Sequence, residues 1–416
     1  TAKNYLVVLD GRIKDLFQQS IDEMNQIYSV SKKLNETYDA QKYVVVFGKN
    51  AAVYGFAEEK DAKNIKEEFE KLDDVKVEIS SPMSDSRLTP PTKLKNNWFS
   101  RPFRMFVEMY GVPSYTDFDP TNLVAITYTF LFGMMFGDVG QGIVLSLVGY
   151  FFYKWKGMQL GAVGVRLGIS STIFGFVFGS VFGSEELFEH FMEPMFLPMD
   201  PDNTMTLLMS AIATGVVLII ISIAFNIFLN LKKKNWGEML FSQNGVAGLV
   251  FYVSVLLLVA NMLVGMNLPL GGPVYIALLI AMPVVMIFLK EPLCHKLEGE
   301  KMFPHGFGAF FTEAFFELFE VMLTFIANTM SFLRVGGFVL SHAGMMMVVY
   351  TLAKMVAGGP GIINFGYILV AIIGNIFVMC LEGMIVGIQV LRLEFYEMFS
   401  RYYEGKGKPF QSIQEK

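Results

Sequence analysis

The stretch EAFFELFEVMLTFIANTMSFLRVGGFVLSH, from Glu313 to His342, decides the fold of this chain. It is apolar enough for a membrane, yet Arg334 lies deep inside it. An ionised side chain near the bilayer centre costs at least about 2.5–3.5 kcal/mol, so such residues usually mark a functional path. Seven polar residues recur at spacings of three, four and seven, which places them on one helix face. They are Glu313, Glu317, Glu320, Thr324, Ser331, Arg334 and Ser341. The sequence therefore predicts a membrane helix with a polar stripe.

The composition of the whole chain also indicates a membrane protein. Of its 416 residues, 53% are hydrophobic and 17% are charged, whereas soluble domains have about 45–50% apolar and about 25% charged residues. The net charge of −5 and the lack of a basic tract argue against nucleic acid as a partner. Two cysteines, Cys294 and Cys380, are too few for a disulfide framework or a metal cluster, and we interpret them as structural thiols. We expect no metal ion or other cofactor.

Charge patterning divides the chain near residue 118. Residues 1–118 predict a cytoplasmic α/β domain and linker, with strands at Tyr5–Gly11, Tyr43–Gly48 and Val75–Ile79 between amphipathic helices. A Ser/Pro-rich linker follows over residues 80–97. Residues 119–410 predict an all-α transmembrane domain, and residues 411–416 a C-terminal tail. Because the chain starts at Thr1 rather than Met, we interpret its amino terminus as cut, processed or incompletely represented.

Eight apolar segments predict a polytopic protein with about eight transmembrane helices. Their approximate bounds are 122–136, 139–155, 161–183, 205–231, 244–265, 272–290, 307–357 and 362–400. The sequence GDVGQG, with Asp138 among glycines, separates the first two, although one continuous helix from Leu123 to Trp155 is an alternative. The last two exceed the roughly 20 residues that span a bilayer. They are expected to tilt, to project into water or to kink, and Gly336–Gly337 offers a kink point.

The connecting loops alternate in charge, which predicts the orientation. One set of loops carries Lys154, Lys156, Lys232, Lys233, Lys234, Lys290, Lys296, Lys301, Arg401, Lys406 and Lys408. The opposite set, at 184–204, 266–271 and 358–361, contains no Lys or Arg. The positive-inside rule then places both termini in the cytoplasm. The acidic loop 184–204 is interpreted as a solvated face, and His190, His295 and His305, which lie in loops, are assigned no role.

The last segment carries a second polar stripe. Asn375, Glu382, Gln389 and Tyr396 follow one another at steps of seven, and Arg392 lies three residues beyond Gln389. Glu382 has no basic neighbour within a turn, so its carboxyl group has to be neutral or paired. Acids on two helices with an arginine between them predict cation translocation. Since arginine does not release its proton, it suits a barrier between two half-paths better than a relay.

Each candidate also has a structural interpretation. Arg334 is alternatively a structural arginine paired with a helix carboxylate. Arg392 lies near the end of its apolar run, where its side chain can reach the interface. His342, eight residues after Arg334, is alternatively a satisfied residue inside the bundle.

Several motifs resemble one known family. NTMSFLRVGGFVLSHAGM (328–345) and LEGMIVGIQVLRLEFYEMFSRYYEGKGKPF (381–410) resemble the membrane domain of subunit a, or subunit I, of V-type and A-type rotary ATPases. FLFGMMFGDVGQG (130–142) resembles the motif at its first two spans, and LKNNWFSRPFRMFVEMYGVPSYTDFDPT (94–121) the segment that leads into the membrane. The resemblance covers about residues 87–410, and FVLSHAGM is similar to the bacterial and archaeal branch.

The resemblance implies a stator subunit of a bacterial or archaeal plasma membrane. Such a subunit forms two half-channels against a ring of proteolipid c subunits and carries H+ or Na+ as the ring turns. Its other implied partners are the peripheral stalk and the central-stalk ATPase sector, which hydrolyses ATP, so the chain has no catalytic residues of its own. Arg334 and Arg392 match the family's two essential arginines, and Glu320, His342 and Glu382 match half-channel positions. Glu317, Asn328, Ser331 and Gln389 are added from the stripes as candidate lining residues.

Two other functions compete with the stator. A stand-alone secondary cation transporter or antiporter predicts internal repeats with interrupted helices in both halves, whereas here the polar stripes are confined to the last two segments. A membrane scaffold would use the charges only to pair helices. The sequence does not specify H+ or Na+, because in the family the ring's own site sets most of that choice.

Overall fold

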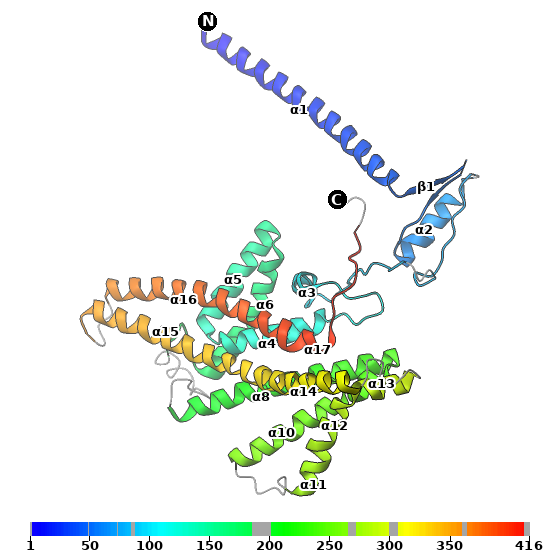
Figure 1. The fold of residues 1–416 in the computed structure, drawn as a ribbon. Coiled ribbons are helices and arrows are strands. Elements are labelled where there is room, and N and C mark those ends of the chain that lie inside the picture. The colour runs from blue at the N-terminus through cyan, green and yellow to red at the C-terminus, as the bar shows by residue number, and fades with distance from the viewer. Residues whose placement is uncertain are drawn as a thin grey trace. The chain divides into compact units, whose positions relative to one another are not determined.

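The computed structural model describes residues 2–48, 50–72, 74–84, 88–184, 201–264, 272–298, 307–359 and 364–411 (Figure 1). It divides into two compact units, the first of residues 1–93 with 407–416 and the second of residues 94–406. Most of the acidic loop 184–204, the loop 266–271, Lys301, His190 and His305 lie outside the described residues. Each unit is described by itself.

The first unit is built from one long helix, a hairpin and a short helix. These elements are α1 (Ala2–Gln41), β1 (Val44–Phe47), β2 (Asn50–Val53) and α2 (Glu59–Phe69). The two strands are antiparallel, with Val44 opposite Val53, and Gly48 takes the positive φ of 62° that the tight turn requires. The strand near Tyr43 and the helix over α2 were both expected from the sequence.

Two other strand predictions for this unit are wrong. Tyr5–Gly11 is part of α1, and Val75–Ile79 joins no sheet. A strand needs a partner for its backbone groups, and β1 finds its partner in the next segment, β2, rather than in a distant one. Left without a ladder, the first apolar run continues the helical pattern that follows it. The expected α/β domain is therefore not confirmed.

The second unit is almost entirely helical. Its first elements are η1 (Arg101–Phe103), α3 (Arg104–Tyr110), α4 (Thr121–Met135), α5 (Val139–Lys156) and α6 (Gln159–Phe178). The next are α8 (Pro201–Lys233), α9 (Trp236–Phe241), α10 (Val246–Val264), α11 (Pro273–Tyr275), η2 (Ile276–Ala281), α12 (Met282–Phe288) and α13 (Lys290–Glu298). The last are α14 (Phe307–Ser331), α15 (Leu333–Ala357), α16 (Phe365–Arg392), η3 (Leu393–Phe399) and α17 (Ser400–Tyr402), where η2 and η3 are π-helical.

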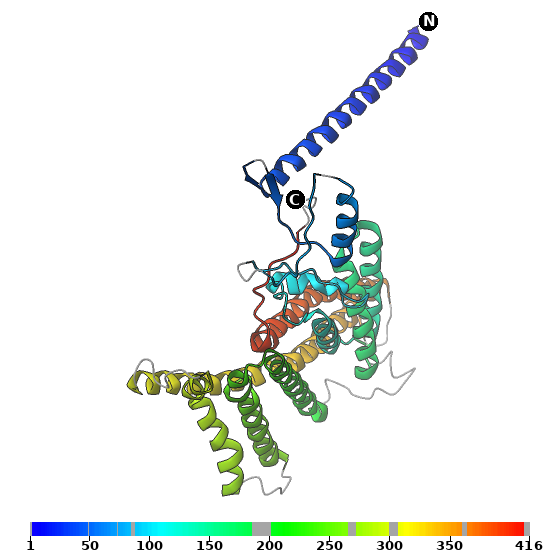
Figure 2. The ribbon, with the colours of Figure 1, turned by 90° about the vertical axis from the view of Figure 1, so that its right-hand side faces the viewer.

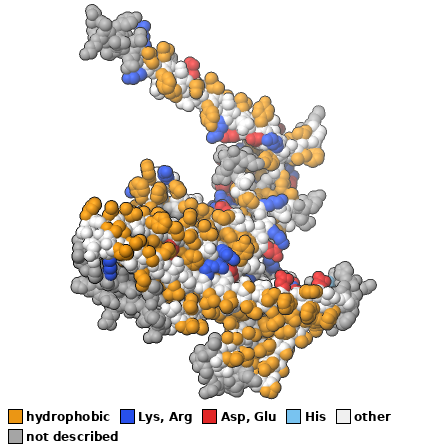
Figure 3. Space-filling view, turned by 60° about the vertical axis from the view of Figure 1, so that its left-hand side comes forward, with side chains coloured by type: hydrophobic (Ala, Val, Ile, Leu, Met, Phe, Trp, Pro, Cys, Tyr) orange, Lys and Arg blue, Asp and Glu red, His pale blue; other side chains and the backbone are white. Residues whose placement is uncertain are grey.

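Five helical stretches of the described chain are long and apolar enough to cross a membrane. They are Gln159–Phe178, Asn203–Lys233, Trp236–Met262, Phe310–Ala357 and Phe365–Tyr402. Thr121–Met135 and Pro273–Phe288 are apolar but shorter. The chain is thus a polytopic helical membrane protein, and hydrophobic side chains cover most of the face of this unit in Figure 3. The count of eight spans stays a prediction, because the shorter helices do not reach the length that a span needs.

The break between α4 and α5 falls where the sequence predicted it. Helix α4 ends at Met135, and α5 begins at Val139. Asp138 caps α5, since its Oδ1 accepts the backbone N–H of Gln141 at 2.8 Å. One continuous helix from Leu123 to Trp155 is therefore excluded.

The predicted kink in the seventh segment lies elsewhere. The helix is interrupted at Phe332, between α14 and α15, rather than at Gly336–Gly337. Phe332 is fully buried against Gly215 of α8, where a Cβ atom would meet its ring at 2.1 Å. Gly336 lies inside α15 and lets it approach Leu208 of α8. The bend is thus set by the packing of an aromatic ring, and the glycine serves close helix contact.

Glycines also join α5 to α6, which lie side by side in Figures 1 and 2. A Cβ atom on Gly161 of α6 would meet the carbonyl oxygen of Gly149 of α5 at 2.6 Å. Such small residues allow backbones to approach closely in a membrane, where packing drives helix association. Helix α4 contacts α6, α15 and α16. It therefore links the pair α5–α6 to the long helices α15 and α16, which run beside each other (Figure 1).

Candidate functional site

His342 and Glu382, both predicted from the sequence, meet between α15 and α16. The Nδ1 atom of His342 lies 2.5 Å from Oε2 of Glu382. Their exposed fractions are 4% and 1%, so both side chains are buried. A buried carboxylate without a partner pays a large desolvation cost, and the imidazole provides that partner. The lone carboxyl group expected in the last span is therefore paired.

Asp138 approaches the same histidine from the other side. Its Oδ2 lies 3.9 Å from Nε2 of His342. Besides capping α5, the carboxylate accepts the hydroxyl of Ser180 at 2.7 Å and the backbone N–H groups of Phe182 at 3.0 Å and Gly183 at 2.6 Å. These hydrogen bonds to the turn after α6 fix the Asp138 carboxylate in place beside the imidazole. The result is a buried row of carboxylate, imidazole and carboxylate.

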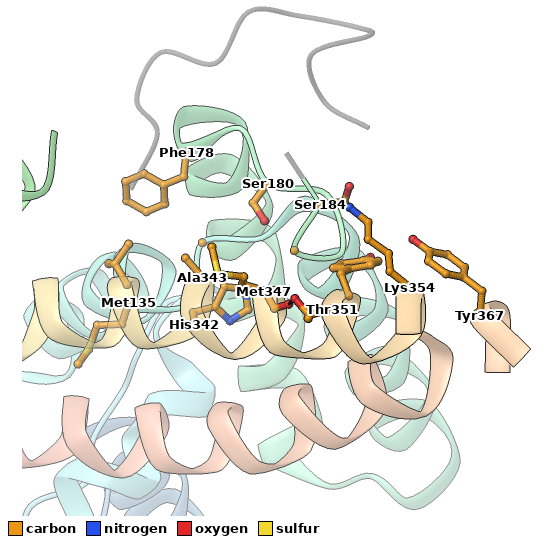
Figure 4. A pocket seen from close by; sticks show the side chains of 14 residues that line it. Met135, Phe178, Ser180, Ser184, His342, Ala343, Met347, Thr351, Lys354 and Tyr367 are labelled. Carbon is orange, nitrogen blue, oxygen red and sulfur yellow. Dashed lines mark hydrogen bonds between the residues drawn. The ribbon is translucent and has the colours of Figure 1, made fainter. Parts of the chain in front are cut away.

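A cavity of about 220 Å³ opens beside His342 (Figure 4). Apart from apolar groups, it is lined by Ser180, Ser184, Tyr350, Thr351, Lys354 and Tyr367. Figure 4 shows Lys354 and Tyr367 at the end of the cavity that lies farthest along α15 from Met135. That end is formed by the C-terminal part of α15 and the N-terminal part of α16. The cavity therefore leads from the imidazole toward one end of the helices.

The two predicted arginines belong to a second group of charges. Arg334 donates from Nη2 to the Ser331 hydroxyl at 3.1 Å, and Ser331 donates in turn to Oε1 of Glu397. Arg334 also interacts electrostatically with Arg392 and Glu397. Its Nη1 is buried without a hydrogen-bond partner in the described part of the chain. The alternative that Arg334 pairs with a helix carboxylate is confirmed only indirectly, because the Ser331 hydroxyl lies between Arg334 and the Glu397 carboxylate.

Arg392 is exposed on the surface of the second unit. Its neighbours one turn away on the same helix face are Ile388 and Tyr396, with exposed fractions of 57% and 70%. A guanidinium in an apolar exposed stripe has no ordinary reason to face lipid hydrocarbon. Within the chain, Glu397 is an acidic group that interacts with Arg392 electrostatically.

The other predicted residues are not brought into these two groups. Glu317 lies on α14 and pairs with Lys290 at 3.8 Å, while Glu320 is exposed on the same helix. Asn328 is half-buried, and Gln389 is half-buried with an Oε1 atom that has no hydrogen-bond partner among the described residues. Ser331 is the one added residue that contacts a predicted arginine.

Several functional candidates were not assigned from the sequence. Glu397 and Arg401 are both buried, and Arg401 donates from Nη1 to Asn244 at 3.2 Å. Gln141 donates to Asn375 at 3.1 Å beside the histidine pair. A sequence signal did exist for Glu397, since it follows Arg392 by five residues near a predicted helix end. Asp138 was noted only as a break between spans.

Comparison with known proteins finds one family that the chain resembles. The profile of the V-type ATPase 116kDa subunit family matches residues 3–174. Over 96% of its length, the chain is 27% identical to the A-type ATP synthase subunit I of Aeropyrum pernix, of which it covers 63%. The chain is thus similar to this family and to the archaeal subunit I in particular. It is also 25% identical to the subunits I of Methanocaldococcus jannaschii, over 96% of the chain and 60% of that protein, and of Saccharolobus solfataricus, over 98% and 66%.

The archaeal subunits I match a longer part of the chain than the family profile does. The arginines, His342 and Glu382 lie outside residues 3–174, but inside the length shared with the archaeal subunits I. The chain spans 60–66% of the length of these three relatives. The roles of these residues in the chain are therefore inferred from the contacts they make in it.

Proposed function

We propose that the chain is the stator subunit of the membrane sector of a V/A-type rotary ATPase. It carries H+ or Na+ through two half-channels against a ring of proteolipid c subunits, as the ring turns. ATP hydrolysis takes place on other subunits. The observation that carries the proposal is the exposed Arg392 in an apolar stripe, together with the half-buried Arg334 that interacts with it electrostatically.

The apolar stripe around Arg392 is proposed as the ring-facing surface. Met384, Ile388 and Tyr396 are exposed on the same face of the last span. Lipid alone leaves the Arg392 charge unpaired at a cost of about 2.5–3.5 kcal/mol. A ring subunit that brings a membrane carboxylate to this stripe would pair with the charge and release its cation. Arg334, held by Ser331, would keep positive charge at the same level.

The two acidic groups lie on opposite sides of the arginines along the helices. Glu382 precedes Arg392 by ten residues, or about 15 Å at 1.5 Å per residue, and His342 follows Arg334 by eight. Glu397 lies beyond Arg392 in the other direction. We assign the row of Asp138, His342 and Glu382, with its cavity, to one half-channel and the Glu397 side to the other. The arginines block direct passage between them, because a fixed positive charge repels a cation.

The proposed orientation follows from loop charge. The cavity beside His342 leads toward the helix ends joined by the loop 358–361, which has no Lys or Arg. The positive-inside rule places this end outside the cell and both termini in the cytoplasm. The Glu397 side then faces the cytoplasm of a bacterial or archaeal plasma membrane. The cytoplasmic part before residue 119 is proposed to meet the peripheral stalk and, through it, the central-stalk ATPase sector.

Purification of the tagged chain from its native membrane tests the proposal. Ring and ATP-hydrolysing subunits should be recovered with it in fixed proportion after mild detergent extraction. Recovery of the chain alone, with cation exchange across vesicles that needs no ATP, would support a secondary transporter and refute the stator. A control extraction in a denaturing detergent should release the partners.

A further inference from the structure

A buried carboxyl group, Glu394, plays no part in the site described above. It lies in the π-helical η3, two residues after Arg392, and its exposed fraction is 0%. Neither of its carboxyl oxygens has a hydrogen-bond partner in the described part of the chain. Buried polar groups are nearly always paired, so such an exception asks for an explanation. Short π-helical turns are frequent at functional sites.

Hydroxyl groups surround Glu394 from two other helices. The Thr127 hydroxyl of α4 lies close to its carboxyl group, and Tyr128 of α4 and Tyr402 of α17 interact with it electrostatically. The hydroxyl groups of Thr127 and Tyr128 donate hydrogen bonds to the backbone carbonyls of Leu123 and Gly387, at 2.9 Å each. The Tyr402 hydroxyl is buried and has no partner among the described residues. Near the C-terminal end of the last span, the Glu394 carboxyl and the Tyr402 phenol thus interact electrostatically, and neither has a hydrogen-bond partner among the described residues.

The chemistry of this position favours a neutral carboxylic acid at rest. An ionised carboxylate in such surroundings pays several kcal/mol of desolvation that no cation offsets. A metal ion such as Na+ would need more oxygen lone pairs than one carboxyl and one uncommitted hydroxyl provide. A protonated Glu394, in contrast, carries no charge and avoids this cost.

Glu394 also interacts with the arginine group. Glu397, three residues later in η3, is the charged group that acts on it. Oε1 of Glu397 is occupied by the Ser331 hydroxyl, whereas Oε2 is buried and free of donors in the described part of the chain. One carboxyl oxygen of Glu397 therefore faces Arg334 through Ser331, and the other remains to accept a proton.

We propose that Glu394 is a proton-exchanging residue of the half-channel on the Glu397 side. It takes a proton from a hydronium ion at the C-terminal end of the span: one O–H bond of the hydronium breaks, a water molecule remains, and an O–H bond forms on the Glu394 carboxylate. That bond breaks when the proton passes to Oε2 of Glu397, and no electrons are exchanged. The inference rests on the proposed stator function and names the residue that supplies the arginine side with protons.

The test uses the whole complex in vesicles, with ATP hydrolysis and ATP-driven proton uptake measured on the same samples. Glu394→Gln keeps the shape and the hydrogen-bonding capacity but cannot exchange a proton. Loss of a proton-transfer group typically costs about 100-fold or more, so proton uptake should fall by about that factor while the ring still co-purifies. Glu404→Gln is the matched control, because Glu404 is an exposed carboxylate that pairs with Lys406 at 2.8 Å.

Glu394→Asp and Glu394→Asn form a second pair of equal size. If Glu394→Gln fails to assemble, the aspartate variant should still transport faster than the asparagine variant. Equal rates in this pair, wild-type uptake in Glu394→Gln, or uptake of Na+ instead of protons by the wild type would each overturn the inference. Arg334→Ala, measured in parallel, separates the two proposals. If it transports normally, the stator function fails, and if only Glu394→Gln transports normally, the further inference alone fails.

Discussion

Replacement of Glu382 by Gln tests the buried row beside the cavity. The substitution removes the charge from the side chain that lies 2.5 Å from Nδ1 of His342. It keeps the volume and leaves an amide that still bonds the imidazole. Any effect therefore comes from the loss of charge and of proton exchange, and not from a cavity in the core.

The magnitude follows from the geometry. A hydrogen bond to a charged group contributes about 1.5–3 kcal/mol, and about 1.4 kcal/mol corresponds to a factor of ten. Asp138 cannot take over the role of Glu382, because it stands 3.9 Å from the ring and already accepts four hydrogen bonds. ATP-driven cation transport by the Glu382→Gln complex should thus fall about 10- to 100-fold.

The assay is initial transport rate in vesicles, completed as a double-mutant cycle with His342→Gln. If the two side chains act as one unit, the double variant should lose little more than either single variant. Glu108→Gln serves as a control, since Glu108 is an exposed carboxylate that pairs with Arg104 at 2.7 Å outside the long helices. Wild-type transport in Glu382→Gln, or strictly additive losses in the cycle, would refute the reasoning.

Three further predictions concern neighbouring features. Ser331→Ala removes the hydroxyl that holds Arg334, so coupled transport should fall by a factor set by about 0.5–1.5 kcal/mol, with ATP hydrolysis retained, as measured on one vesicle preparation. Gly161→Leu forces a side chain into the backbone of Gly149 and should destabilise the purified subunit by at least about 1–3 kcal/mol, seen as a lower thermal unfolding midpoint; an unchanged midpoint would contradict the close packing. Burial, with smaller effects of nearby acids, raises the pKa of Tyr403 in the folded protein. Above a pH of about 10, the usual pKa of tyrosine, the phenol therefore ionises in the unfolded chain before it does so in the folded one. The stability of the folded state is unaffected by this group below that pH and falls as the pH rises above it. Tyr403→Phe should therefore show a smaller loss of unfolding midpoint than the wild type between neutral and strongly alkaline pH, whereas equal losses would refute the assignment.

The helical part of the fold was predictable because its signals are local. Apolar runs and the polar break at Asp138 gave the positions of the helices to within a few residues. The strand predicted at Tyr5–Gly11 is instead part of α1, because an apolar run becomes a strand only if another segment pairs with it. The interruption at Phe332 was also missed, since it depends on the contact with Gly215 of α8, a helix more than 100 residues earlier.

The sequence was enough to predict most residues of the candidate site, but it predicted only partly which of them contact one another. Arg334, Arg392, His342 and Glu382 stand out because charges are expensive in apolar segments. The pairing of His342 with Glu382 is a tertiary contact that spacing along one helix cannot reveal. For the same reason Glu317 was grouped with Arg334, while the structure pairs it with Lys290.

Carboxyl groups near a helix end are the hardest case. Glu394 and Glu397 sit where a sequence looks interfacial, and exposed acids are common there. Only the packing of α4 and α17 around them shows that they are buried. Their burial therefore depends on the fold and not on the pattern.

In the proposed function, Arg334 separates two half-channels and couples transport to ATP hydrolysis. Arg334→Ala in the complete complex, reconstituted in vesicles, tests this claim most directly when ATP hydrolysis and cation uptake are recorded together. Arg104→Ala is the matched control, because this arginine lies outside the long helices. The Arg334→Ala complex should assemble and hydrolyse ATP but transport no cation, while the Arg104→Ala complex should transport normally. Cation uptake at the wild-type rate in the Arg334→Ala complex would contradict this claim.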